Sequence, residues 1–65
     1  MKYFILHNGE ILGMSDKALD AVNIFFDWRY CLKAGLLELH KVQFSKKGYT
    51  VEDVLIQSAN LGNNS

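Results

Sequence analysis

The sequence predicts a single α+β domain with the element order ββαβα, in which an antiparallel sheet packs on one long helix. Three observations support this fold class. An Asn-Gly pair separates two apolar runs near the N-terminus, an aromatic-rich segment of helical character fills the middle, and apolar residues recur at helical spacing near the C-terminus. A chain of 65 residues has the size of one small domain. We place that domain at residues 1–62 and expect a frayed tail at residues 63–65.

Residues 2–14 form the predicted β-hairpin. Asn8-Gly9 favours a two-residue type I′ turn, because both of its central positions need a positive φ. This turn fixes the register of the two strands through three facing pairs: His7 and Glu10, Leu6 and Ile11, Ile5 and Leu12. We interpret the His7–Glu10 pair as a cross-strand charge contact rather than as a catalytic pair.

Residues 15–33 are predicted to form the long helix, with Ser15 as the N-cap and Gly35 just beyond the C-terminal end. Its apolar residues form two adjoining stripes, so the helix is apolar over more than the usual single face. The stripe that we expect in the core comprises Leu19, Val22 and Phe26. The second stripe leaves a flank, formed by Ile24, Trp28 and Leu32, that we expect to mediate a homodimer or to bind a partner. Cys31 is expected to be a small buried hydrophobe.

A narrow polar strip follows the same helix. It comprises Asp16, Asp20, Asn23 and Asp27, at spacings of i, i+4, i+7 and i+11. The simplest interpretation of this strip is the solvated face of an amphipathic helix. The functional interpretation is a docking face, because acids at the border of an apolar patch suit a basic partner surface through electrostatic steering.

Residues 36–44 are predicted to form a third strand. Its alternation changes phase between Leu39 and Val42, which indicates a bulge or an early loop. A short helix over residues 36–41 is the alternative. After a turn at residues 45–48, residues 51–61 carry apolar residues at helical spacing and are predicted to form a second, shorter helix. A strand over residues 49–56 that pairs with the third strand is the alternative.

The bulk properties restrict the class of function. Seven basic and seven acidic side chains give zero net charge, whereas nucleic-acid-binding domains usually carry a basic excess. The sequence has no apolar run of about 18 residues that would span a membrane, and it has one cysteine, which fits a reducing cytoplasm. We find no metal-ligand spacing, no phosphate-binding loop and no catalytic motif. The prediction is therefore a non-enzymatic interaction module without a cofactor.

Four short stretches carry a resemblance to a known family: Leu19-Asp20, Asp27-Trp28-Arg29-Tyr30, Ala34-Gly35 and Glu38-Leu39-His40-Lys41-Val42. With these motifs, residues 19–43 resemble the small phage inhibitors of bacterial RNA polymerase, which have a hairpin, a helix and a strand in the same order. The resemblance implies a protein that blocks a basic, DNA-facing part of the polymerase. Asp20 matches the family's helix acid and Lys41 its first basic strand position, but Gln43 stands at the second basic position.

The function predicted from these observations is a small, phage-encoded inhibitor in the bacterial cytoplasm. It would bind a basic or nucleic-acid-binding surface of a host complex, such as RNA polymerase or a CRISPR defence complex. The predicted partner-binding residues are Asp16, Asp20, Asn23, Asp27, Trp28 and Lys41. The alternative is a small nucleic-acid-binding or transcription-regulating domain with a basic, aromatic edge. That edge comprises His40, Lys41, Phe44, Lys46, Lys47 and Tyr49.

Overall fold

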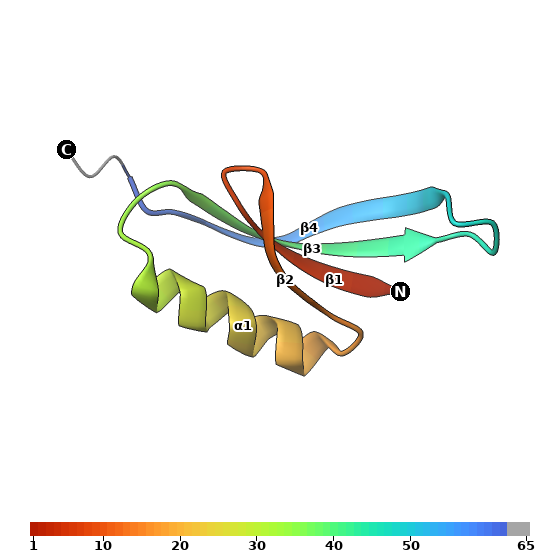
Figure 1. Ribbon diagram of the computed structural model, residues 1–65, viewed down its shortest axis with the longest axis horizontal. Helices are drawn as coiled ribbons and strands as arrows, with labels where there is room; N and C mark the ends of the chain where they lie inside the picture. The colour runs from red at the N-terminus through yellow and green to blue at the C-terminus, as the bar shows by residue number, and fades with distance from the viewer. Residues whose placement is uncertain (63–65) are drawn as a thin grey trace.

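In a computed structural model, which describes residues 1–62, four antiparallel strands form one sheet and a single helix lies on one of its faces (Figure 1). The strands are β1 (Lys2–His7), β2 (Glu10–Ser15), β3 (Leu36–Phe44) and β4 (Thr50–Asn60), and the helix is α1 (Ala18–Cys31). The strand order across the sheet is β2-β1-β3-β4. The expected fraying of residues 63–65 concerns a part of the chain outside the described residues.

The predicted ββαβα order is wrong, because the C-terminal segment is strand β4 and not a helix. β4 pairs along the whole of β3 and so satisfies the backbone groups on that edge of β3. Two register shifts leave Val51 and Ile56 as extra residues in β4. These bulges interrupt the period of two, so the apolar residues fall at a spacing that resembles a helix.

Helix α1 is shorter than predicted, with 14 residues instead of a helix over residues 15–33. Ser15 is the last residue of β2, and its hydroxyl accepts a hydrogen bond from the Lys17 backbone N–H at 3.1 Å. Lys17 occupies the N-cap position in an extended conformation and makes no side-chain cap. The hydroxyl therefore stabilises the turn that leads into the helix rather than the first turn of the helix itself.

The N-terminal hairpin is confirmed, with positive φ values of 52° at Asn8 and 88° at Gly9. His7 faces Glu10 and Leu6 faces Ile11, as predicted. The third predicted pair is wrong, because Ile5 faces Gly13 after a register shift at which Leu12 is the extra residue. A single extra residue in β2 displaces every later pair by one position.

Strand β3 is also confirmed, and its change of phase has a structural reason. Leu37 and Leu39 lie on the face that α1 covers and are fully buried, whereas Val42 lies on the opposite face. On that opposite face the Phe44 ring meets the Phe4 ring edge to face, with centroids 6.4 Å apart. The phase change therefore marks a strand that contributes apolar side chains to both faces of the sheet.

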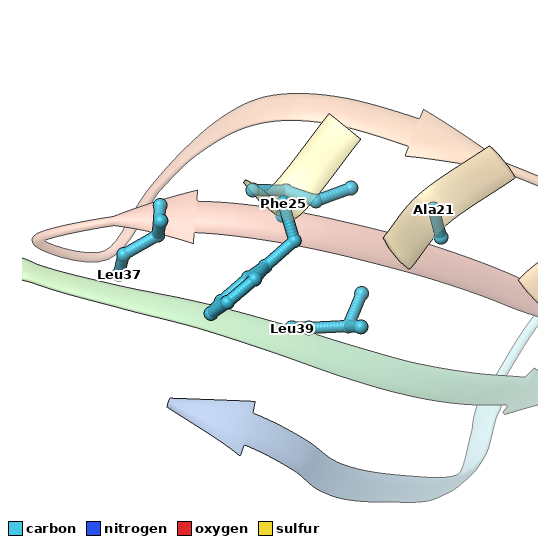
Figure 2. Close-up of a cluster of buried hydrophobic side chains, with 5 residues drawn as sticks. Ala21, Phe25, Leu37 and Leu39 are labelled. Atoms are coloured by element: carbon cyan, nitrogen blue, oxygen red, sulfur yellow. The ribbon is translucent and has the colours of Figure 1, made fainter. Parts of the chain in front are cut away.

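The hydrophobic core lies between α1 and the centre of the sheet. Figure 2 shows Ala21 and Phe25 reaching from α1 toward Leu37 and Leu39 of β3. The buried cluster comprises Ile5, Ala21, Phe25, Leu37 and Leu39. Around it, Ile24, Trp28 and Leu32 are partly buried against the core. The flank that we expected to bind a second copy or a partner is therefore largely occupied by contacts within the chain.

The stripe predicted for the core mostly faces solvent. Leu19 is 72% exposed and Phe26 is 49% exposed, while Val22 is half-buried. Tyr30, on the same side of the helix as Leu19 and Phe26, is 92% exposed. Cys31, expected to be buried, is exposed as well. The two apolar stripes therefore have the opposite roles to those predicted.

Helix α1, the single helix among residues 1–62, is too short to cross a membrane.

Candidate functional site

The outer face of α1 combines exposed apolar residues with acids. Leu19, Phe26 and Tyr30 recur at i, i+7 and i+11, so they form one ridge along the side of the helix that faces away from the sheet. Asp20 and Asp27 are exposed on the same outward side. We call these five residues the outer ridge. A ridge of large apolar side chains beside carboxylates has the composition of a protein-docking surface rather than of an ordinary solvated helix face.

The acids of the outer ridge are free of ion pairs within residues 1–62. Asp20 lies in the first turn of α1, where the helix dipole favours a negative charge. Asn23 is exposed on the same side of the helix. Three of the six predicted partner-binding residues, Asp20, Asn23 and Asp27, are therefore brought together on one accessible face.

Asp16 has a different role from the other acids of the predicted row. It precedes α1, and its carboxylate pairs with the Lys2 ammonium at the start of β1. The hydrogen bond from Lys2 and the positive charge of the same side chain hold the pKa of Asp16 below its usual value of 3.8. Asp16 thus ties the connection before α1 to the sheet, and its charge is already matched.

The remaining two predicted partner-binding residues lie away from the outer ridge. Trp28 is partly buried and packs against the core beneath α1. Lys41 is partly buried on β3, where it pairs in register with Tyr3. The tertiary structure therefore divides the predicted set between the outer ridge, the core and the sheet.

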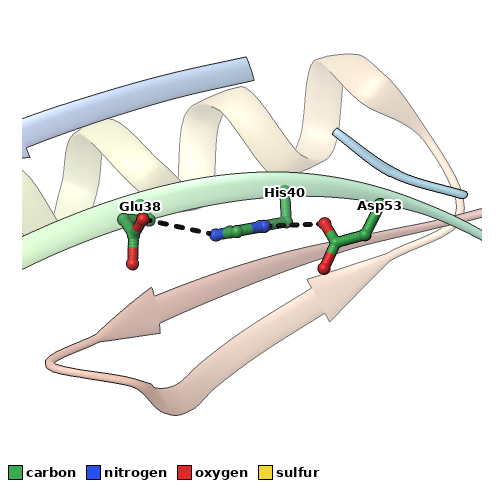
Figure 3. Close-up of polar contacts among 3 residues, drawn as sticks. All are labelled: Glu38, His40 and Asp53. Carbon is green, nitrogen blue, oxygen red and sulfur yellow. Dashed lines mark hydrogen bonds and ion pairs between the residues drawn. The ribbon is translucent and has the colours of Figure 1, made fainter. Parts of the chain in front are cut away.

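The second candidate surface is the face of the sheet that α1 does not cover, which we call the open face (Figure 1). Three polar residues meet there, as Figure 3 shows. His40 of β3 shares a hydrogen bond with Asp53 of β4, with 2.8 Å between Nδ1 and Oδ1. On the other side of the ring, His40 Nε2 lies 3.5 Å from Glu38 Oε2. A shallow apolar hollow adjoins this cluster, lined in part by Phe4 and Leu6.

The geometry of this cluster differs from that of a hydrolytic triad. In a nucleophile–histidine–acid arrangement, one ring nitrogen faces the acid and the other faces a serine or cysteine. In this cluster both ring nitrogens of His40 face carboxylates. Within residues 1–62 no group of three or more His, Cys, Asp or Glu side chains has the arrangement of a metal site. The cluster therefore works best as a polar link between β3 and β4.

The predicted basic edge is not one continuous surface. His40 lies on the open face beside two carboxylates, whereas Lys41, its neighbour in β3, points to the face that carries α1. Phe44 packs against Phe4. Lys46, Lys47 and Tyr49 are exposed in and beside the turn between β3 and β4. The two lysines at the turn thus remain a small, separate basic group.

Comparisons with protein-family models, curated proteins and solved structures give no match to this chain. The resemblance to the phage inhibitors of RNA polymerase therefore stays a prediction.

Two features of these surfaces were missed from the sequence. The outward position of Leu19, Phe26 and Tyr30 had a signal, because the polar strip marks the solvent side of α1 and these residues adjoin it. The apolar stripe opposite the strip, centred on Phe25, was the better candidate for the core. The meeting of His40 with Asp53 had no such signal, since it depends on the register of β4.

Proposed function

We propose that this protein is a non-enzymatic inhibitor that binds a basic surface of a bacterial protein complex through the outer ridge of α1. The observation that carries the proposal is the exposure of Leu19, Phe26 and Tyr30 beside two unpaired acids. Exposed aromatic side chains supply the apolar contact area of many protein interfaces. The acids supply charge complementarity and faster association with a basic partner.

Inhibition follows if the covered surface is one that the partner uses for nucleic acid. Basic surfaces of this kind are common on polymerases and on RNA-guided defence complexes, because they neutralise phosphates. An acidic helix face can occupy such a surface electrostatically, and the body of the domain then obstructs it sterically. RNA polymerase is the first partner to test, because residues 19–43 resemble the phage inhibitors of that enzyme.

The test is binding of purified bacterial RNA polymerase core enzyme to immobilised wild type and to two charge-matched variants. Asp20→Lys/Asp27→Lys reverses the acids of the outer ridge, and Glu10→Lys/Glu52→Lys makes the same net change at exposed acids outside α1. We expect the first variant to associate more slowly and to bind at least about tenfold more weakly, and the second to bind like wild type. A third variant, Leu19→Ala/Tyr30→Ala, should dissociate faster.

Several outcomes would contradict this proposal. Equal weakening by both charge-reversed variants would show that net charge matters and the outer ridge does not. Binding of plain DNA or RNA with a steep dependence on salt would favour the nucleic-acid-binding alternative. If the core enzyme does not bind, RNA polymerase is the wrong partner, and a CRISPR effector complex is the next probe for the same three variants.

A further inference from the structure

Over residues 50–58, the outer edge and both faces of strand β4 are open to solvent. In the described part of the chain it is the last strand of the sheet, so its outer edge has no neighbour. Helix α1 packs over β1, β2 and β3, and every residue from Thr50 to Ser58 is exposed. The strand nevertheless carries large aliphatic side chains at its centre, with Val54, Leu55 and Ile56 each between 43% and 49% exposed. A long apolar edge of this kind is a template for another strand.

The charges of β4 select how a second copy of the strand can pair with it. Glu52 and Asp53 lie in its N-terminal half, and the C-terminal half, residues 57–60, is uncharged. Parallel pairing in register would place acids against acids. Antiparallel pairing about the midpoint between Leu55 and Ile56 instead places Asp53 opposite Ser58 of the second copy, and it joins the two aliphatic centres. Like charges directly opposite each other destabilise a sheet, so the antiparallel arrangement is favoured.

The bulge in β4 makes this antiparallel register geometrically consistent. Residues directly opposite each other in an antiparallel pair point to the same face of the sheet. Asp53 and Ser58 are five positions apart, so in a regular strand they would point to opposite faces. The extra residue Ile56 restores the match, because Asp53 pairs with Val42 and Ser58 with Glu38, both of which lie on the open face.

Residues of β4 on the face that carries α1 also meet the requirement that opposite residues point to the same face. Val54 pairs with Lys41 and Gln57 pairs with Leu39, and both of these β3 residues point to the face that carries α1. Val54 and Gln57 are also opposite each other in the proposed register. In this register, opposite residues of the two β4 strands therefore point to the same face of the sheet, and no acid lies opposite another acid.

We propose that the protein forms a closed, two-fold symmetric dimer in which the β4 edges of two copies pair antiparallel about the midpoint between Leu55 and Ile56. The two-fold axis runs perpendicular to the sheet, so both copies of α1 lie on the same side of one continuous sheet. A two-fold interface of this kind uses the same edge of both copies and is therefore closed. The remaining edge, β2, has only six residues and contains a bulge, which disfavours further growth of the sheet. This inference does not depend on the function proposed for the outer ridge.

Sedimentation equilibrium of the full chain over a range of concentrations tests the dimer. Leu55→Lys introduces charge at the two-fold axis and should raise the dimer dissociation constant at least about tenfold. Ile11→Lys makes the same change at an exposed residue of β2 and should leave the constant unchanged. Leu55→Lys/Ile56→Glu places opposite charges across the axis and should restore association. A wild type that stays monomeric up to millimolar concentration, or one that forms open-ended polymers, would overturn the proposal.

Cross-linking tests the register in a Cys31→Ser background. Chains with Asp53→Cys are mixed with chains with Ser58→Cys and oxidised, with far-UV circular dichroism as the control for folding. Directly opposite β-carbons lie about 4.5–5.5 Å apart, near the distance that a disulfide bridges. We expect disulfide-linked dimers from the mixture and few from either variant alone. Equal linking in the Asp53→Cys variant alone would indicate parallel pairing or packing of the open faces, and it would overturn the register.

Discussion

Phe25 and Phe26 are adjacent, identical side chains on α1, and their rings meet edge to face with centroids 5.4 Å apart. Phe25 is 1% exposed and fills the space between α1 and β3, whereas Phe26 is 49% exposed on the outer ridge. One step along a helix turns a side chain by about 100°. Hydrophobicity alone therefore does not assign a residue to the core, because the direction of the sheet relative to the helix decides which side chains are buried.

The largest effect that we expect comes from this pair. Phe25→Ala should lower the free energy of unfolding by about 3–5 kcal/mol, because it opens a cavity among fully buried neighbours. Phe26→Ala should cost about 1 kcal/mol or less, because it removes a half-exposed ring and one edge-to-face contact. Urea denaturation followed by circular dichroism measures both values. A larger loss for Phe26→Ala would assign the core to the other stripe of α1.

An intermediate loss of stability is expected from alanine substitutions at two glycines, one in a packed and one in an open part of the chain. Gly35 and Gly48 have similar positive φ values of 100° and 91°, but a Cβ at Gly35 would collide with the side-chain ends of His7 and Asn8, whereas a Cβ at Gly48 meets nothing within 4 Å. Hydrogen bonds to the backbone of Ala34 and Leu36 hold these two side-chain ends in place. Gly35→Ala should therefore cost about 2–4 kcal/mol, against about 1 kcal/mol for Gly48→Ala. The same urea titration compares them, and equal costs would show that backbone strain dominates at both sites.

A smaller effect is expected on the outer ridge itself. Leu19→Ser/Tyr30→Ser should change the free energy of unfolding by about 1 kcal/mol or less, because both side chains are mostly exposed. The matched variant on the inner side is Ala21→Ser, at a residue with no exposure, where a buried hydroxyl should cost more. Thermal unfolding of the two variants checks the order. The reverse order would show that the outer ridge is part of the core.

The smallest change in the free energy of unfolding is expected from substitutions of the acids before and on α1. Because Lys2 lowers the pKa of Asp16, this pair adds stability above pH 3.8, and the contribution disappears as the pH falls through the lower pKa of the folded state. Asp16→Asn should lower the urea midpoint slightly at neutral pH, and it should have no effect in acid strong enough to protonate Asp16 in the folded state as well. Asp27 is exposed beyond the first turn of α1 and has no ion-pair partner within the described residues, so Asp27→Asn serves as the control. A shift that persists in strong acid would exclude the ion pair as its cause.

The parts of the fold that depend on neighbouring residues could be predicted from the sequence. Asn8-Gly9 specified a two-residue turn because few residues accept positive φ, so the hairpin and its first two pairs were correct. The aromatic-rich segment specified a helix, and residues 36–44 a strand. The polar strip also indicated the orientation of α1, because the face of a helix opposite its polar strip is the face that packs against the sheet.

The strand conformation of residues 50–60 and the composition of the surfaces depend on contacts between segments that are distant in the sequence. Their spacing suited a helix because bulges at Val51 and Ile56 hide the alternation of the strand, and the backbone groups of β3 provide the partner that makes it a strand. The same pairing brings Asp53 to His40, thirteen residues away in sequence. Contacts of this kind join backbone segments whose register depends on the whole sheet, and no local pattern encodes them.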